Sequence, residues 1–164
     1  MCRMNFIKLI IAGLFFYMMS PFIFAASSSN ELTVAGYWQS IDGKTKKPSS
    51  IIHIESKGQF FEGKIVKTYS LPDERKIDVC DTCRGEQKNK PIIGLTIIKH
   101  MVCGPTFCSE GTILDPRDGS IYHATMKLVN GGKQLYVHGY VGIPLFGKTV
   151  IWTRVSASAV RSKK

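Results

Sequence analysis

The chain has 164 residues and a formal net charge of +10 at neutral pH. This length is sufficient for one domain with a hydrophobic core and leaves little room for a second, so we expect a single domain. The positive charges are scattered, apart from clusters at 43–47 and 161–164. Such a pattern suits solubility and loose attraction to anionic groups.

The N-terminal residues have the pattern of a secretory signal peptide. Basic residues come first, an apolar run follows at 9–25, and small polar residues come directly after it. This order predicts a signal helix at 1–26 that is removed by cleavage, and a short polar linker at 27–33. The alternative is an uncleaved membrane anchor. It is disfavoured because the run is short for a spanning helix and contains Pro21.

Removal of the signal sets the expected compartment and charge. The mature chain loses Arg3 and Lys8, so its net charge falls from +10 to +8. We expect a protein of the periplasm, or a secreted one, with no stable membrane span after cleavage. A scattered positive surface suits an anionic envelope component, such as lipid head groups, as a partner. Nucleic acid is not expected as a partner, because an exported protein seldom meets it.

Downstream of the signal, the sequence has the pattern of short strands and turns, with no convincing helix. Apolar and polar residues alternate with a period of two at 121–128. Turn signals follow such segments, as in Asp-Pro-Arg-Asp-Gly at 115–119 and Gly-Gly at 131–132. The connection at 70–90 is the exception, because it is long and polar. The expected strands are 34–41, 50–56, 59–69, 91–102, 109–115, 121–128, 134–142 and 147–155.

Four cysteines remain after cleavage, because Cys2 leaves with the signal. An even number in an exported chain favours disulfides, and loop-closure entropy favours crossed bonds between the two pairs over local bonds. The spacing also approximates a four-thiolate zinc site, which export disfavours. A redox dithiol would need an activating helix N-terminus, and the pattern shows none. The four residues are Cys80, Cys83, Cys103 and Cys108.

Eight short antiparallel strands suit a sandwich or a closed barrel, and one constellation favours the barrel. Gly36 and Trp38 open the first strand, and Arg154 lies in the last. In a closed barrel these strands pair, so the guanidinium can lie across the indole and close the bottom. These residues resemble the signature of lipocalin-like barrels. We predict an all-β fold, a single antiparallel up-and-down barrel at 34–155, with a basic disordered tail at 156–164.

Several blocks between residues 34 and 155 also match a known family in order. They are AGYWQSIDGKTKKPSSIIHI, CDTCRGEQKNKPIIGLTII, EGTILDPRDG and VHGYVGIPLFGKTVIWTRV. They resemble the bacterial family called domain of unknown function 2147. The resemblance implies a small exported domain with a lipocalin-like barrel. It lends no catalytic residues, because the family has no assigned reaction.

The resemblance also bears on the cysteines. The first Cys-x-x-Cys commonly occurs in the family without a second pair and must then pair within itself, which implies local disulfides here. The sequence departs from the family pattern at 102–108, where relatives usually have a plain polar turn in place of the second cysteine pair.

No catalytic group is evident. His123 and His138 lie near each other across the hairpin expected at Gly131. A two-histidine site is conceivable there, but ordinary surface histidines are favoured, because one residue of register separates the side chains. No Ser/His/Asp arrangement and no glycine-rich phosphate loop is recognisable. We expect neither a metal nor a cofactor.

A small barrel of this kind is either filled by side chains or holds one small ligand. We predict non-catalytic binding of a small hydrophobic or amphipathic ligand, with apolar and aromatic residues at the barrel mouth as contacts. One alternative is a structural or interaction module of the envelope with a filled barrel. A thiol redox or zinc-binding protein is less favoured. The predicted ligand contacts are Phe60, Phe61, Tyr122, Tyr140, Leu145 and Phe146.

Overall fold

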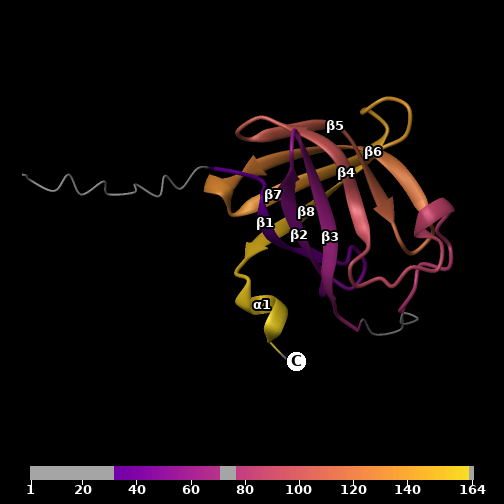
Figure 1. The fold of residues 1–164 in the computed structure, drawn as a ribbon. Helices are drawn as coiled ribbons and strands as arrows, with labels where there is room; N and C mark the ends of the chain where they lie inside the picture. The colour runs from indigo at the N-terminus through magenta and orange to yellow at the C-terminus, as the bar shows by residue number, and fades with distance from the viewer. Residues whose placement is uncertain (1–31, 71–76, 163–164) are drawn as a thin grey trace, which may run out of the picture.

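Residues 32–70 and 77–162 are described by the computed structural model, and their strands close into a barrel (Figure 1). Each strand pairs with the next in antiparallel fashion, and β1 pairs with β8. The predicted up-and-down barrel is therefore confirmed. The predicted signal at 1–26 lies outside the described residues. The strands are β1 Gly36–Ile41, β2 Pro48–Lys57, β3 Phe60–Thr68, β4 Thr96–Cys103, β5 Phe107–Asp115, β6 Ser120–Val129, β7 Gln134–Tyr140 and β8 Gly147–Val155.

Alternation along the strands builds the core. In β6 the side chains of Ala124, Met126 and Leu128 are buried, and in β7 those of Leu135 and Val137. Successive side chains of a strand point to opposite faces, so one set fills the interior and the other faces outward. The sequence pattern at 121–128 predicted this inward set.

The fourth strand differs from its expected range. Residues 91–95 form a turn, and β4 begins only at Thr96. Gly94 has a φ of 92° there, a conformation that ends extended pairing, and its amide donates to Ile65 O. Pro91 makes an isolated bridge with Val79. The polar connection between β3 and β4 is thus folded back on itself. It also contains the short 3₁₀ helix η1, Gly85–Gln87.

The barrel has two different ends. Hairpins β2–β3, β4–β5 and β6–β7 lie at the end where β1 begins, and we call this the closed end. The β6–β7 hairpin includes the 3₁₀ helix η2, Asn130–Gly132. Connections β1–β2, β3–β4, β5–β6 and β7–β8 lie at the opposite end, which we call the open end.

Arg154 closes the barrel as predicted. It pairs with Trp38 across β8 and β1, and its guanidinium carbon lies 4.2 Å from the indole centroid. The guanidinium donates hydrogen bonds to Gly132 O at 2.6 Å, Ala35 O at 2.8 Å and Thr33 O at 2.5 Å. A Cβ at Gly36 would lie 2.8 Å from Arg154 Nη1, so the arginine needs glycine there.

Two local disulfides join the cysteines. Cys80 bonds Cys83, and Cys103 bonds Cys108. The local pairing is confirmed, and the crossed and zinc alternatives are wrong in this structure. The second bond joins register partners of β4 and β5. It therefore ties that hairpin at the closed end.

The first disulfide holds a loop against the open end. Both of its cysteines are buried. Thr82 Oγ1 donates to Pro116 O at 3.2 Å. A Cβ at Gly119 would lie 2.2 Å from Thr82 O, so the β5–β6 turn and this loop are in close contact.

The C-terminal residues differ from the expected disordered tail. Ser158–Arg161 form one helical turn, α1. Lys67 Nζ donates to Ala159 O at 2.8 Å and to Ser162 O at 2.6 Å, which ties the turn to β3. Composition alone gave no sign of this contact. Among the described residues, no helix has the length and apolar character needed to span a bilayer.

Candidate functional site

A cavity of about 1240 Å³ extends from the open end into the barrel. Small-molecule sites in proteins typically measure about 300–1000 Å³, so this space, mouth included, can hold one ligand. A barrel filled by side chains, the alternative considered from the sequence, does not fit such a cavity. The deeper lining is apolar and comes from inward-facing positions of several strands. It includes Ile52, Ile65, Ile97, Ile113, Val137, Val150 and Trp152.

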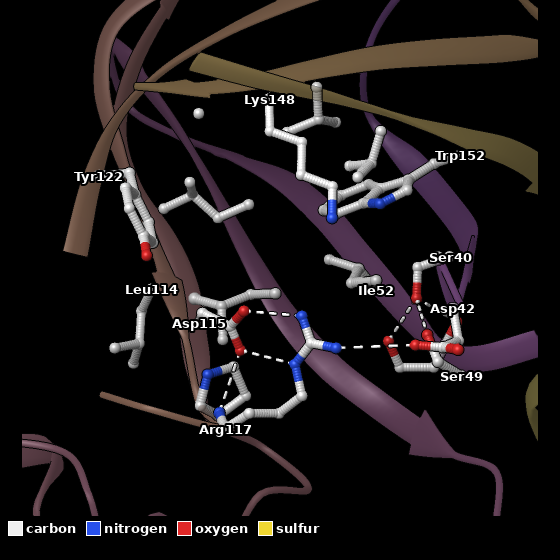
Figure 2. Close-up of a pocket in the computed structure, with 18 of the residues that line it drawn as sticks. Ser40, Asp42, Ser49, Ile52, Leu114, Asp115, Arg117, Tyr122, Lys148 and Trp152 are labelled. Carbon is white, nitrogen blue, oxygen red and sulfur yellow. Dashed lines mark hydrogen bonds and ion pairs between the residues drawn. The ribbon is translucent and has the colours of Figure 1, made fainter. Parts of the chain in front are cut away.

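The polar side chains of the cavity gather at its mouth. On β8 the inward-facing row runs from Trp152 through Val150 to Lys148, so an apolar wall ends in an ammonium group. Arg117 enters from the β5–β6 turn, and Figure 2 shows it between Asp115 and Asp42. The cavity is therefore amphipathic, with an apolar interior and charged groups at the opening.

Arg117 links the end of β5 to the β1–β2 turn across the mouth. Its Nε and Nη2 donate to the two carboxylate oxygens of Asp115 at 3.0 and 2.8 Å. Its Nη1 lies 3.6 Å from Asp42 Oδ2 (Figure 2). Burial raises the pKa of Asp115, but the hydrogen bonds and positive charge of Arg117 outweigh it and leave that pKa below its usual value.

Asp42 organises the β1–β2 turn. Its Oδ1 accepts hydrogen bonds from Thr45 N at 2.7 Å, Thr45 Oγ1 at 2.9 Å and Lys44 N at 3.0 Å. These bonds from Thr45 hold the pKa of Asp42 below its usual value. Nearby, Ser40 Oγ lies 2.6 Å from Ser49 Oγ, which adds a hydroxyl cluster to the rim.

These contacts predict a loss of stability in acid. The folded-state pKa values of Asp42 and Asp115 lie below the unfolded value of about 3.9. Each carboxylate therefore stabilises the fold above that pH and loses this contribution as the pH falls through its folded value. We expect the free energy of unfolding by urea to decrease below about pH 4, and to decrease less in Asp115→Asn. An identical decrease in both proteins would contradict the assignment for Asp115.

The Lys148 ammonium also lies at the mouth of the cavity. In the part of the chain that the structure describes, no hydrogen bond or ion pair within 4.0 Å engages Nζ. It attracts Asp115 at longer range. In Figure 2 the side chain extends over the cavity from β8, opposite Arg117. It is placed to meet a negative group of a molecule in the cavity.

The predicted ligand contacts divide between the two ends. Tyr122, Tyr140, Leu145 and Phe146 line the cavity or its rim. Phe60 and Phe61 are not part of the lining, because β3 begins with them at the closed end. The structure therefore places these two predicted contacts away from the cavity.

The sequence pattern missed the charged residues of the mouth. The pattern at 115–119 indicates a turn that accounts for its two carboxylates, and it gives Arg117 no role at the mouth. A signal for Lys148 did exist, since it stands four residues before Trp152 on a strand and therefore on the same face. The sequence does not show that Asp42 meets Arg117, because that contact depends on barrel closure.

The two-histidine site, which the sequence disfavoured, does not form as a direct cross-strand pair. His123 lies opposite Tyr140, and His138 lies opposite Thr125. Both ring nitrogens of His138 are engaged, one with Thr149 Oγ1 at 2.9 Å and one with Pro144 O at 2.8 Å. Within residues 32–70 and 77–162, no three His, Cys, Asp or Glu side chains are grouped as metal ligands.

Comparison with known proteins agrees with the fold. The family model described as "Uncharacterized protein conserved in bacteria (DUF2147)" matches residues 36–154. A solved structure of protein HP1028 from Helicobacter pylori, described as belonging to the lipocalin family, superposes with a TM-score of 0.66. That match has 17% sequence identity and covers 79% of this chain and 87% of the other. At this identity the likeness concerns the fold alone. No curated protein is significantly similar to the chain.

Proposed function

The chain belongs to the bacterial family DUF2147, and we propose that this member binds one small amphipathic molecule in its barrel without catalysing a reaction. The observation that carries the proposal is the cavity of about 1240 Å³, with apolar walls and a charged mouth. The lipocalin-like fold of the Helicobacter pylori protein supports the same role, because such barrels have room for one ligand.

The lining favours a ligand with an apolar tail. The deeper walls consist of buried apolar side chains such as Ile52 and Trp152. They offer no charged partner to a polar group of a ligand. A polar group placed there would lose its hydrogen bonds to water without replacement, which costs free energy. An alkyl or aromatic tail has no hydrogen bonds to water to lose, and burying its apolar surface lowers the free energy of binding.

The mouth favours an anionic head group. Arg117 already forms a hydrogen bond with Asp115 and an ion pair with Asp42, whereas Lys148 lacks a close acceptor. A carboxylate or phosphate at the opening would meet the Lys148 ammonium while the tail stays in the barrel. Hydrogen bonds to charged groups contribute more than neutral ones, so this contact provides specificity.

We further propose that the protein acts outside the cytoplasm, in the periplasm or secreted. The support is the signal-like pattern at 1–26 together with two disulfides, which persist in oxidising compartments. Intact mass of the protein from cell-envelope fractions tests this. We expect loss of about 26 residues and of the four hydrogens that two disulfides remove.

Ligand class is tested by displacing a fluorescent apolar probe with dodecanoate, dodecanol and dodecyltrimethylammonium. These share a chain length and differ in head-group charge. We expect dodecanoate to bind most tightly and Lys148→Ala to weaken it about tenfold, with little change for dodecanol. Lys127→Ala is the matched control, because Lys127 is exposed on β6 near the closed end. Absence of saturable binding by all three molecules would contradict the proposal.

A further inference from the structure

The β7–β8 connection is an exposed apolar loop beside the cavity mouth. Residues 140–147 read Tyr-Val-Gly-Ile-Pro-Leu-Phe-Gly and contain no charged side chain. Four of them are large apolar residues that expose more than half of their surface to solvent. They are Val141 at 67%, Ile143 at 55%, Leu145 at 82% and Phe146 at 72%.

The loop is held in this conformation rather than left free. The carbonyl of Pro144 can only accept, so His138 Nε2 donates to it at 2.8 Å, and Nδ1 shares a hydrogen bond with Thr149 Oγ1 at 2.9 Å. Phe146 N donates to Ile143 O at 3.2 Å, closing a turn at the tip. These hydrogen bonds hold the apolar side chains in contact with solvent, although exposing apolar surface to water is unfavourable.

A cationic turn lies at the same end of the barrel as the loop. The β1–β2 turn carries Lys44, Lys46 and Lys47, all exposed. Both connections lie at the open end, and a Cβ at Gly43 would lie 3.6 Å from Nζ of Lys148, which follows the loop on β8. Apolar side chains and a cluster of ammonium groups therefore face solvent at the same end.

The net charge of this end is positive. Among the residues lining the mouth, three cations balance three carboxylates. They are Lys44, Arg117 and Lys148, and Asp42, Asp115 and Asp118. Residues 77–95 of the β3–β4 connection are also balanced, with three acidic and three basic residues. The excess in the described residues comes from Lys46 and Lys47.

We propose that this end docks on an anionic lipid surface, with the apolar loop inserted among the head groups and acyl chains and the lysine turn against the phosphates. Exposed apolar side chains flanked by lysines are the combination by which peripheral proteins bind such surfaces. A second copy of the chain fits less well, because a two-fold contact through this face would bring the two lysine clusters together.

Docking places the cavity mouth against the lipid. Leu145 and Phe146 belong to both the loop and the rim of the cavity. An amphipathic molecule can then pass between the bilayer and the barrel without exposing its tail to water. The docking itself goes beyond ligand binding and does not require it.

Sedimentation with vesicles tests the docking. The probes are vesicles of phosphatidylcholine alone and of phosphatidylcholine with one third phosphatidylglycerol. An uncleaved apolar segment at 9–25 would itself bind lipid. The experiment therefore uses the processed protein, in which intact mass shows that this segment has been removed. We expect binding to the anionic vesicles about tenfold tighter than to the neutral ones, and weakened by salt.

Two sets of variants identify the surface. We expect Leu145→Ser with Phe146→Ser to reduce binding about tenfold or more, and Lys46→Glu with Lys47→Glu to reduce it similarly for anionic vesicles only. The controls at the closed end are Phe107→Ser, which replaces a phenylalanine that is 50% exposed, and Lys127→Glu. Circular dichroism checks that each variant is folded.

Several outcomes overturn the proposal. Failure of the wild-type protein to bind anionic vesicles does so, as does unchanged binding by the loop variant. A dimer that the loop variant converts to a monomer, without vesicle binding, would assign the loop to self-association. Gly139→Phe, which fills the cavity, should still dock, and this separates failure of docking from failure of ligand binding.

Discussion

Replacing Arg154 with alanine is expected to lower the free energy of unfolding by about 3 kcal/mol, measured by urea denaturation. The substitution removes the cation that lies over the Trp38 ring. It also leaves three carbonyl oxygens at the closed end without their donor. Polar groups left unsatisfied at a partly buried site cost more than the net gain from each bond.

Arg84→Ala is the matched control for this prediction. Arg84 is exposed in the β3–β4 connection, so its loss should change stability by less than about 0.5 kcal/mol. Gly36→Ala adds a geometric check, because its Cβ would meet Arg154 Nη1 at 2.8 Å. That clash is absent without the arginine, so Gly36→Ala should be less costly in the Arg154→Ala background. Equal effects of Arg154→Ala and Arg84→Ala would show that the arginine does not close the barrel.

Filling the cavity should abolish ligand binding while the barrel stays folded. Gly139 of β7 faces the interior, where a Cβ would make ordinary contacts of 3.5 Å with Ile113 and Tyr122. Its backbone is extended, a conformation that residues other than glycine adopt without strain. We expect Gly139→Phe to occupy the space of the ligand tail and to weaken dodecanoate binding about a hundredfold.

The control is Ile151→Phe on the neighbouring strand. Ile151 is 43% exposed and faces outward, so the same ring added there leaves the cavity unchanged. Displacement of the fluorescent probe by dodecanoate measures both variants, and thermal unfolding checks that each is folded. Retention of binding by Gly139→Phe would place the ligand outside the barrel.

Much of the fold could be predicted from sequence because its signals are local. Alternation with period two and turn residues located the strands, and Trp38 with Arg154 indicated that the first and last strands meet. The start of β4 was missed because Pro91–Leu95 is as apolar as a strand, and the pattern does not show that Gly94 turns the chain. The helical turn α1 was missed because its anchor, Lys67, is distant in sequence.

The candidate site could be predicted only in part, because it depends on which ends of the strands meet. In an up-and-down barrel successive connections alternate between the two ends, so the β2–β3 hairpin lies at the closed end with Phe60 and Phe61. Applying that parity would have excluded them. The contact between Arg117 and Asp42 needs the closed barrel and the register, which no local pattern contains.

Native mass spectrometry of the processed protein tests whether the barrel holds a ligand. We expect protein purified from cells to carry one small amphipathic molecule, or to take up one dodecanoate per chain when it is added. The Gly139→Phe variant should show the mass of the chain alone under both conditions. A wild-type spectrum without any bound molecule, even after addition of dodecanoate, would contradict a ligand-binding barrel.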